Sequence, residues 1–85
     1  MVAAHIRIAP LGSTSEFDPT ALRDLIYTQG TQNGIEHVRV RAGPYGTDIL
    51  AFIDGDDPEE ATKALHQIVN RTIAGTPALR RWRII

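Results

Sequence analysis

The sequence contains no cysteine, only one lysine, and no apolar run near the roughly 20 residues that a membrane-spanning helix requires. Without cysteine the chain can form neither disulfides nor thiolate metal sites, as expected for a protein of the reducing cytosol. The first ten residues, MVAAHIRIAP, lack the basic and apolar segments of a signal peptide. We therefore expect a cytoplasmic protein that does not bind membranes.

The length and composition predict one domain over residues 1–85. The chain has 85 residues, of which 42% are hydrophobic and 22% are charged. A chain this short buries roughly 60% of the surface that its unfolded form exposes. That is enough for one compact core, but it leaves little room for an enclosed active site.

Four segments have the apolar pattern of β-strands. In three of them, apolar and polar residues alternate, which is typical of strands with one buried face. The fourth, ILAFI, is apolar on both faces, as an interior strand would be. The four predicted strands are HIRIA (5–9), IEHVRVRA (35–42), ILAFI (49–53) and RRWRII (80–85).

Two helices are predicted between these strands, each starting at an Asp-Pro pair. Asp18 and Asp57 are good N-cap residues, and the following prolines suit the first helical position. The expected inner faces contain Leu22, Leu25 and Ile26 in the first helix. Those of the second helix are Ala61, Leu65, Ile68, Val69 and Thr72. Gly30 and Gly75 are interpreted as the glycines that end the two helices, with Gly30 in the left-handed conformation.

The resulting order is β-α-β-β-α-β, in which each half has a strand, an Asp-Pro cap, a helix, a glycine and a strand. We interpret this as the ferredoxin-like α+β arrangement, a four-stranded antiparallel sheet of order 4-1-3-2. Right-handed connections would place both helices on one face of that sheet. The fold alone does not indicate a function, since it carries many unrelated ones.

This arrangement predicts a basic open face on the sheet. Trp82 and Ile84 would face the helices, and strand 48–53 would expose either Leu50 and Phe52 or its odd-numbered residues. In both cases a central apolar strip would lie between charged edge strands. The polar residues expected on the open face are His5, Arg7, His37, Arg39, Arg41, Arg81 and Arg83.

Three explanations of these arginines stay open at this point. Charged side chains on edge strands discourage aggregation through the edges. An apolar strip with an arginine rim could also bind a protein, because arginine pairs well with carboxylates. Alternatively, the same face could bind single-stranded nucleic acid through ring stacking and phosphate contacts. The candidate contact residues are Arg7, Arg39, Arg41, Tyr45, Leu50, Phe52, Arg81 and Arg83.

The nucleic-acid alternative has weaker support from the sequence. The third strand of RNA-recognition domains follows a pattern with several aromatic rings, whereas AGPYGTDILAF offers only Phe52 from the strand itself. The formal net charge of −1 also differs from the positive excess of most phosphate binders.

No catalytic residue, metal ligand or cofactor is predicted. His5 and His37 would be separated by the third strand, which is too far for a shared zinc ion without distortion. The acidic segment DGDDPEE (54–60) lacks calcium-loop spacing and is interpreted as a helix start. Ser13 and Ser15 are interpreted as loop residues.

The main hypothesis is a small non-catalytic domain that associates through its open sheet face, as a homodimer or with a partner protein. The alternatives are single-stranded nucleic-acid binding through the same face and a small oligomeric enzyme that uses a histidine of this face.

Overall fold

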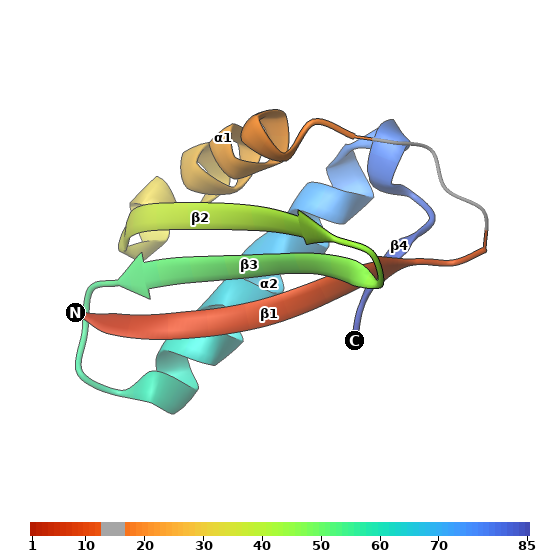
Figure 1. Cartoon of the computed structure of the whole chain (residues 1–85). Coiled ribbons are helices and arrows are strands. Elements are labelled where there is room, and N and C mark those ends of the chain that lie inside the picture. The colour runs from red at the N-terminus through yellow and green to blue at the C-terminus, as the bar shows by residue number, and fades with distance from the viewer. Residues whose placement is uncertain (13–16) are drawn as a thin grey trace.

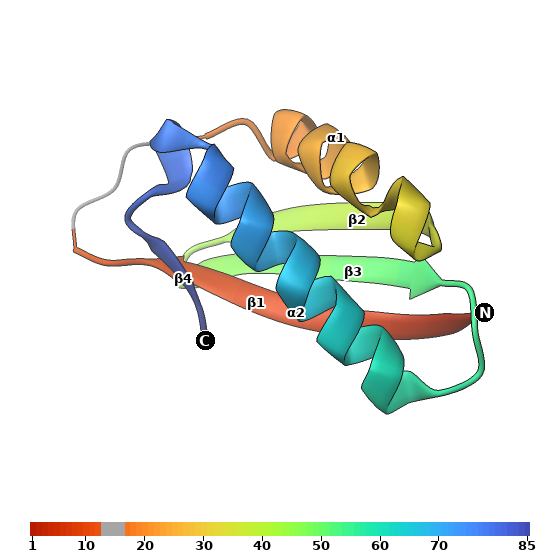
Figure 2. The same cartoon turned by 180° about the vertical axis from the view of Figure 1, so that it is seen from behind.

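The computed structural model describes residues 1–12 and 17–85 and has two layers, a four-stranded sheet and two helices. Figure 1 looks onto the sheet with α2 behind it, and Figure 2 shows the helices in front. The elements in chain order are β1 (Val2–Pro10), α1 (Pro19–Gly30), β2 (Ile35–Gly43), β3 (Gly46–Ile53), α2 (Pro58–Gly75) and β4 (Trp82–Ile84), with short 3₁₀ turns at Thr31–Asn33 and Pro77–Leu79.

The sheet confirms the predicted α+β class and strand order. Its order is β2-β3-β1-β4, which is the predicted 4-1-3-2 read from the other edge. All three neighbouring pairs are antiparallel, and β3 lies between β1 and β2. Both helices cover the same face, so the other face is left open (Figures 1 and 2).

The helix starts are also as predicted. The carboxylate of Asp18 accepts a hydrogen bond of 2.9 Å from the backbone N–H of Thr20. The carboxylate of Asp57 accepts one of 3.0 Å from the N–H of Glu59. Each bond satisfies an amide that the first helical turn would otherwise leave unpaired.

The core lies between the sheet and the helices. Trp82 is 7% exposed, as predicted, and its ring packs edge to face on that of Phe17 with the centroids 4.6 Å apart. Leu25, predicted to be buried, is 40% exposed because it lies at the rim of the narrow apolar stripe of α1. The predicted inner face of α2 is buried throughout: Ala61, Leu65, Ile68, Val69 and Thr72.

The last strand is shorter than predicted. Only Trp82–Ile84 pairs with β1, because Pro77 starts a 3₁₀ turn that buries Leu79 before the strand begins. Arg81 precedes the strand, and its carbonyl accepts a hydrogen bond from the N–H of Leu11 at 2.7 Å. The sequence pattern did not indicate the burial of Leu79.

Gly30 ends α1 as predicted, but the left-handed conformation predicted for it is wrong. Gly30 has a φ of −96°, and the left-handed residue is Gly34, with a φ of 86°. Gly30 is required for space instead, since a Cβ there would overlap Cδ1 of Ile35 and would lie 2.8 Å from its Cγ1. Gly75 ends α2 as predicted, but its φ is not positive and a Cβ there would meet nothing within 4 Å.

We therefore predict opposite effects of alanine at the two helix ends. Gly30→Ala should lower the free energy of unfolding by about 1–3 kcal/mol, because Ile35 must move. Gly75→Ala should raise it by about 0.4–1 kcal/mol, because alanine restricts only the unfolded chain. Urea unfolding of both variants measures the difference, and a change of the same sign in both would contradict this account.

Candidate functional site: the open face of the sheet

The open face consists of the side chains that point away from the helices. The structure determines which residues of β3 belong to it: Ile49, Ala51 and Ile53 are buried, whereas Leu50 and Phe52 are partly exposed on the other side. The face comprises Ala3, His5 and Arg7 of β1, His37, Arg39 and Arg41 of β2, and Asp48, Leu50 and Phe52 of β3.

The strand register arranges these side chains in three rows across the sheet. Directly opposite residues of neighbouring strands have Cβ atoms about 5 Å apart, so members of a row are neighbours. Starting from the β2–β3 turn, the rows are Arg7–Asp48–Arg41, then His5–Leu50–Arg39, then Ala3–Phe52–His37.

Asp48 is the residue of this face that the sequence reasoning missed. The carboxylate Oδ1 accepts hydrogen bonds of 2.9 Å from Nε of Arg7 and from Nε2 of His5. The sequence predicts that strand 48–53 is apolar on either face. Alternation backwards from Phe52 and Leu50 was the signal that would have placed Asp48 beside them.

These contacts change the acidity of Asp48. The hydrogen bonds from Arg7 and, second, from His5 lower the pKa of its carboxyl group below the ordinary value of 3.8. The side chain of Asp48 is 34% exposed, so water screens the ion pair and its contribution to stability is small. The pair fixes the position of Arg7 and neutralises one charge in the row nearest the β2–β3 turn.

Arg39 and Arg41 differ from Arg7 in having no such partner. Both are exposed, and neither forms an ion pair with any residue that the structure describes. Leu50 and Phe52 lie next to them on β3. The three rows hold three arginines and one carboxylate, an excess of two positive charges when their histidines are neutral, and the exposed Glu36 lies beside the rows at the irregularity of β2.

Three predicted contact residues lie outside this arrangement. Tyr45 is 87% exposed at the tip of the β2–β3 turn, beyond the end of the face. Arg81 precedes β4, and Arg83 folds back so that its NH1 group donates to the carbonyls of Arg80 and Trp82 at 3.0 and 2.8 Å. The register pairs Arg83 with Ala9, so Arg83 has the same parity as Arg7, but its guanidinium bonds to neighbouring backbone carbonyls, and Arg81 lies before the short β4.

The acidic segment lies at the other end of the sheet. Ile53, which precedes it, pairs with Val2, whereas the Arg7–Asp48–Arg41 row lies near the β2–β3 turn. The two ends are plain in Figure 1, where the β3–α2 connection runs beside the N-terminus. The exposed acids of this segment are Asp54, Asp56, Asp57, Glu59 and Glu60.

The histidines do not form a shared site. His5 bonds to Asp48, the ring of His37 lies 6.0 Å from that of Phe52, and His66 is bonded to Asn70 on α2. In residues 1–12 and 17–85, no three His, Asp or Glu side chains gather to hold a metal ion. Ser13 and Ser15 lie outside the described residues.

Among residues 1–12 and 17–85, no helix is both long and apolar enough to cross a membrane.

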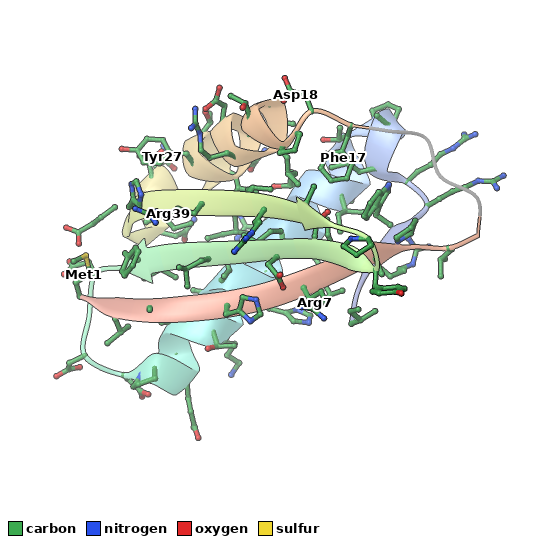
Figure 3. The ribbon with its side chains drawn as sticks, in the orientation of Figure 1. Met1, Arg7, Phe17, Asp18, Tyr27 and Arg39 are labelled. Atoms are coloured by element: carbon green, nitrogen blue, oxygen red, sulfur yellow. The ribbon has the colours of Figure 1, made fainter. Side chains whose placement is uncertain are left out.

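The positions of Arg7 and Arg39 on the open face can be followed in Figure 3, which has the orientation of Figure 1.

Comparison of the chain with models of known protein families, with curated proteins and with solved structures found no match. We therefore infer its function from its own residues.

The ion pair of Asp48 leads to a prediction on pH. Because its pKa is lowered in the folded state, the stabilisation is present above the ordinary pKa of 3.8 and is lost as the pH falls through the folded value. A carboxyl ¹³C NMR titration should place the Asp48 pKa below 3.8. Arg7→Gln should raise this pKa strongly and His5→Gln less so, and titration of the wild type at or above 3.8 would disprove the contact.

Proposed function

We propose that this chain is a small non-catalytic binding domain that associates with a partner protein through the open face of its sheet. The observation that carries this proposal is the pair Arg39 and Arg41, exposed and without an ion-pair partner among the described residues, beside the half-buried Leu50 and Phe52. No described helix or loop lies in front of β2 and β3 on this side of the sheet (Figure 1). We also propose that the fold is the ferredoxin-like arrangement, a reading that the strand order and the one-sided helices support.

The chemistry of the face favours a partner with carboxylates. The planar guanidinium of arginine binds a carboxylate through two parallel hydrogen bonds, which combines affinity with a defined orientation. Leu50 and Phe52 supply apolar area between the charged rows, as the centre of a protein interface does. The expected partner surface is therefore acidic with apolar residues between the acids.

A second copy of the chain fits this face less well. Two open faces that meet would bring together two positive excesses, because the three rows of each hold three arginines and one acid, Asp48, and Glu36 beside the rows offsets only one further charge. Like charges that face each other across an interface oppose association. The homodimer hypothesis thus becomes an outcome that the experiment below can detect.

Single-stranded nucleic acid is the second candidate. The neighbouring rings of Phe52 and His37, with Arg39 next to them, could stack on bases while the arginines contact phosphates. The carboxylate of Asp48 between Arg7 and Arg41 and the formal net charge of −1 disfavour a phosphate backbone. The acidic protein partner is therefore the stronger proposal.

The test compares charge reversal on the two sides of the molecule. We expect a peptide with equal numbers of Glu and Val to bind and to shift the ¹⁵N NMR signals of β2 and β3. Arg39→Glu with Arg41→Glu should weaken this binding at least about tenfold, because attraction becomes repulsion. Arg71→Glu is the matched control, since Arg71 is exposed on α2, behind the sheet, and its reversal should leave binding nearly unchanged.

Two other results would overturn the proposal. Binding of oligothymidylate but not of the peptide at about 50 mM salt would replace it by the nucleic-acid candidate. A concentration-dependent dimer by light scattering, disrupted by Leu50→Ser, would replace it by self-association. If neither acidic peptide nor nucleic acid binds and the protein stays monomeric, association through this face is wrong.

A further inference from the structure

The outer edge of β2 has no strand beside it in the described residues. The strand pairs only with β3, and it is nine residues long, whereas the other edge strand, β4, has three. Its one irregularity lies at its start, between Ile35 and His37, and the pairing is regular from there to Gly43. Edges of this length are normally shortened, covered or bent, because they can pair with another strand.

The backbone groups available at this edge follow from the hairpin. Gly43 and Gly46 are paired on either side of the two-residue turn Pro44–Tyr45, and such a turn is closed by a hydrogen-bonded pair. Hydrogen-bonded and non-hydrogen-bonded pairs then alternate along an antiparallel ladder. By this alternation, Val38 and Val40 form no backbone hydrogen bonds with β3. Their N–H and C=O groups therefore point to the free edge.

A groove runs along the same edge, between β2 and α1. Both Figure 1 and Figure 2 place α1 alongside this edge. Tyr27, which is 43% exposed, is the aromatic side chain of the groove. The groove is lined by Pro19, Thr20, Arg23, Asp24 and Tyr27 of α1 and by residues 37–41 of β2.

A strand laid against β2 would therefore contact two different surfaces. Its side chains alternate, so one set would lie under α1 near Tyr27 and the other set on the open face. On the open face this second set would lie opposite Arg39 and Arg41. Directly opposite charges of unlike sign stabilise a strand pair, and those of like sign destabilise it.

We propose that the edge of β2 binds an extended acidic segment of a partner protein as a fifth strand, with Asp or Glu at alternate positions and apolar residues between them. This inference rests on the proposed function, because the acids would pair with the same Arg39 and Arg41. It adds the conformation of the partner and the backbone contacts that hold it. Main-chain hydrogen bonds give such complexes their affinity, and the alternating side chains give them their specificity.

A second copy of β2 is disfavoured as the fifth strand. Two-fold symmetric antiparallel pairing centred at Arg39 would place Arg39 opposite its own copy, and pairing centred at Val40 would place Arg39 opposite Arg41 of the other chain. All these pairs have like charges, and a partner strand of opposite sign avoids the repulsion.

The experiment uses two peptides of the same composition. In the probe Glu and Val alternate, and in the control all Glu residues precede all Val residues, so only the probe presents one acidic face as a strand. The probe should bind the intact chain at least about tenfold more tightly than the control. It should also slow hydrogen exchange at the N–H groups of Val38 and Val40, while that of Arg39, bonded within the sheet, changes little.

A pair of substitutions at one position isolates the backbone contact. Val40→Pro removes an N–H that faces away from β3, a position where an edge strand tolerates proline. It should weaken binding of the alternating peptide about tenfold, because a carbonyl of the peptide loses its donor. Val40→Ala keeps the N–H while it removes side-chain packing, so it should weaken binding much less, and circular dichroism confirms that both variants are folded.

The outcomes separate this inference from the proposed function. If both peptides bind equally and the amides of Val38 and Val40 stay unprotected, the edge does not take a strand. Should Arg39→Glu with Arg41→Glu still weaken binding in that case, association through the open face stands without the fifth strand. Failure of both peptides to bind contradicts both proposals, and protection that grows with protein concentration alone identifies a second copy as the occupant.

Discussion

The register of β3 between β1 and β2 is the constraint on which the rest of the structure depends. A shift by one residue would turn every side chain of β3 to the opposite face and would expose Ile49, Ala51 and Ile53. The register is fixed at the hairpin, where a Cβ at Gly46 would lie 2.8 Å from the carbonyl oxygen of Ile8. This close approach of β1 sets Asp48 beside Arg7, and from there the three rows of the open face follow.

Sequence reasoning was most successful where one local signal determines the structure. The Asp-Pro pairs fixed both helix starts, and alternation in 35–42 separated Val38 from Arg39 correctly. The sequence could not predict which face of β3 meets the helices, because residues 49–53 are apolar on both faces and show no alternation. The helix-ending glycines showed another limit. Gly30 and Gly75 look alike in sequence, but only Gly30 lies against a side chain, that of Ile35, which is brought back onto the end of α1 where β2 begins.

The site itself depended on contacts across strands, which explains the errors there. Three arginines near the C-terminus suggested a charged β4 edge, but the 3₁₀ turn at Pro77–Leu79 leaves Arg81 before the strand, and Arg83 bonds to neighbouring carbonyls. Arg7 pairs with Asp48, which is 41 residues away in the chain, so no local pattern indicates this contact. A net charge of −1 also conceals that acids gather after β3 while arginines gather toward the β2–β3 turn.

The two explanations of the charged edge strand, protection from aggregation and binding of a partner, are compatible on physical grounds. Arg39 and Arg41 on β2 make pairing with an identical edge unfavourable, since the symmetric registers centred at Arg39, Val40 or Arg41 place arginine opposite arginine. The same side chains attract a strand that carries carboxylates at alternate positions. The stretch Val38–Arg41 of this edge therefore discriminates between strands by charge, and the free N–H and C=O groups of Val38 and Val40 supply affinity to a strand of opposite charge.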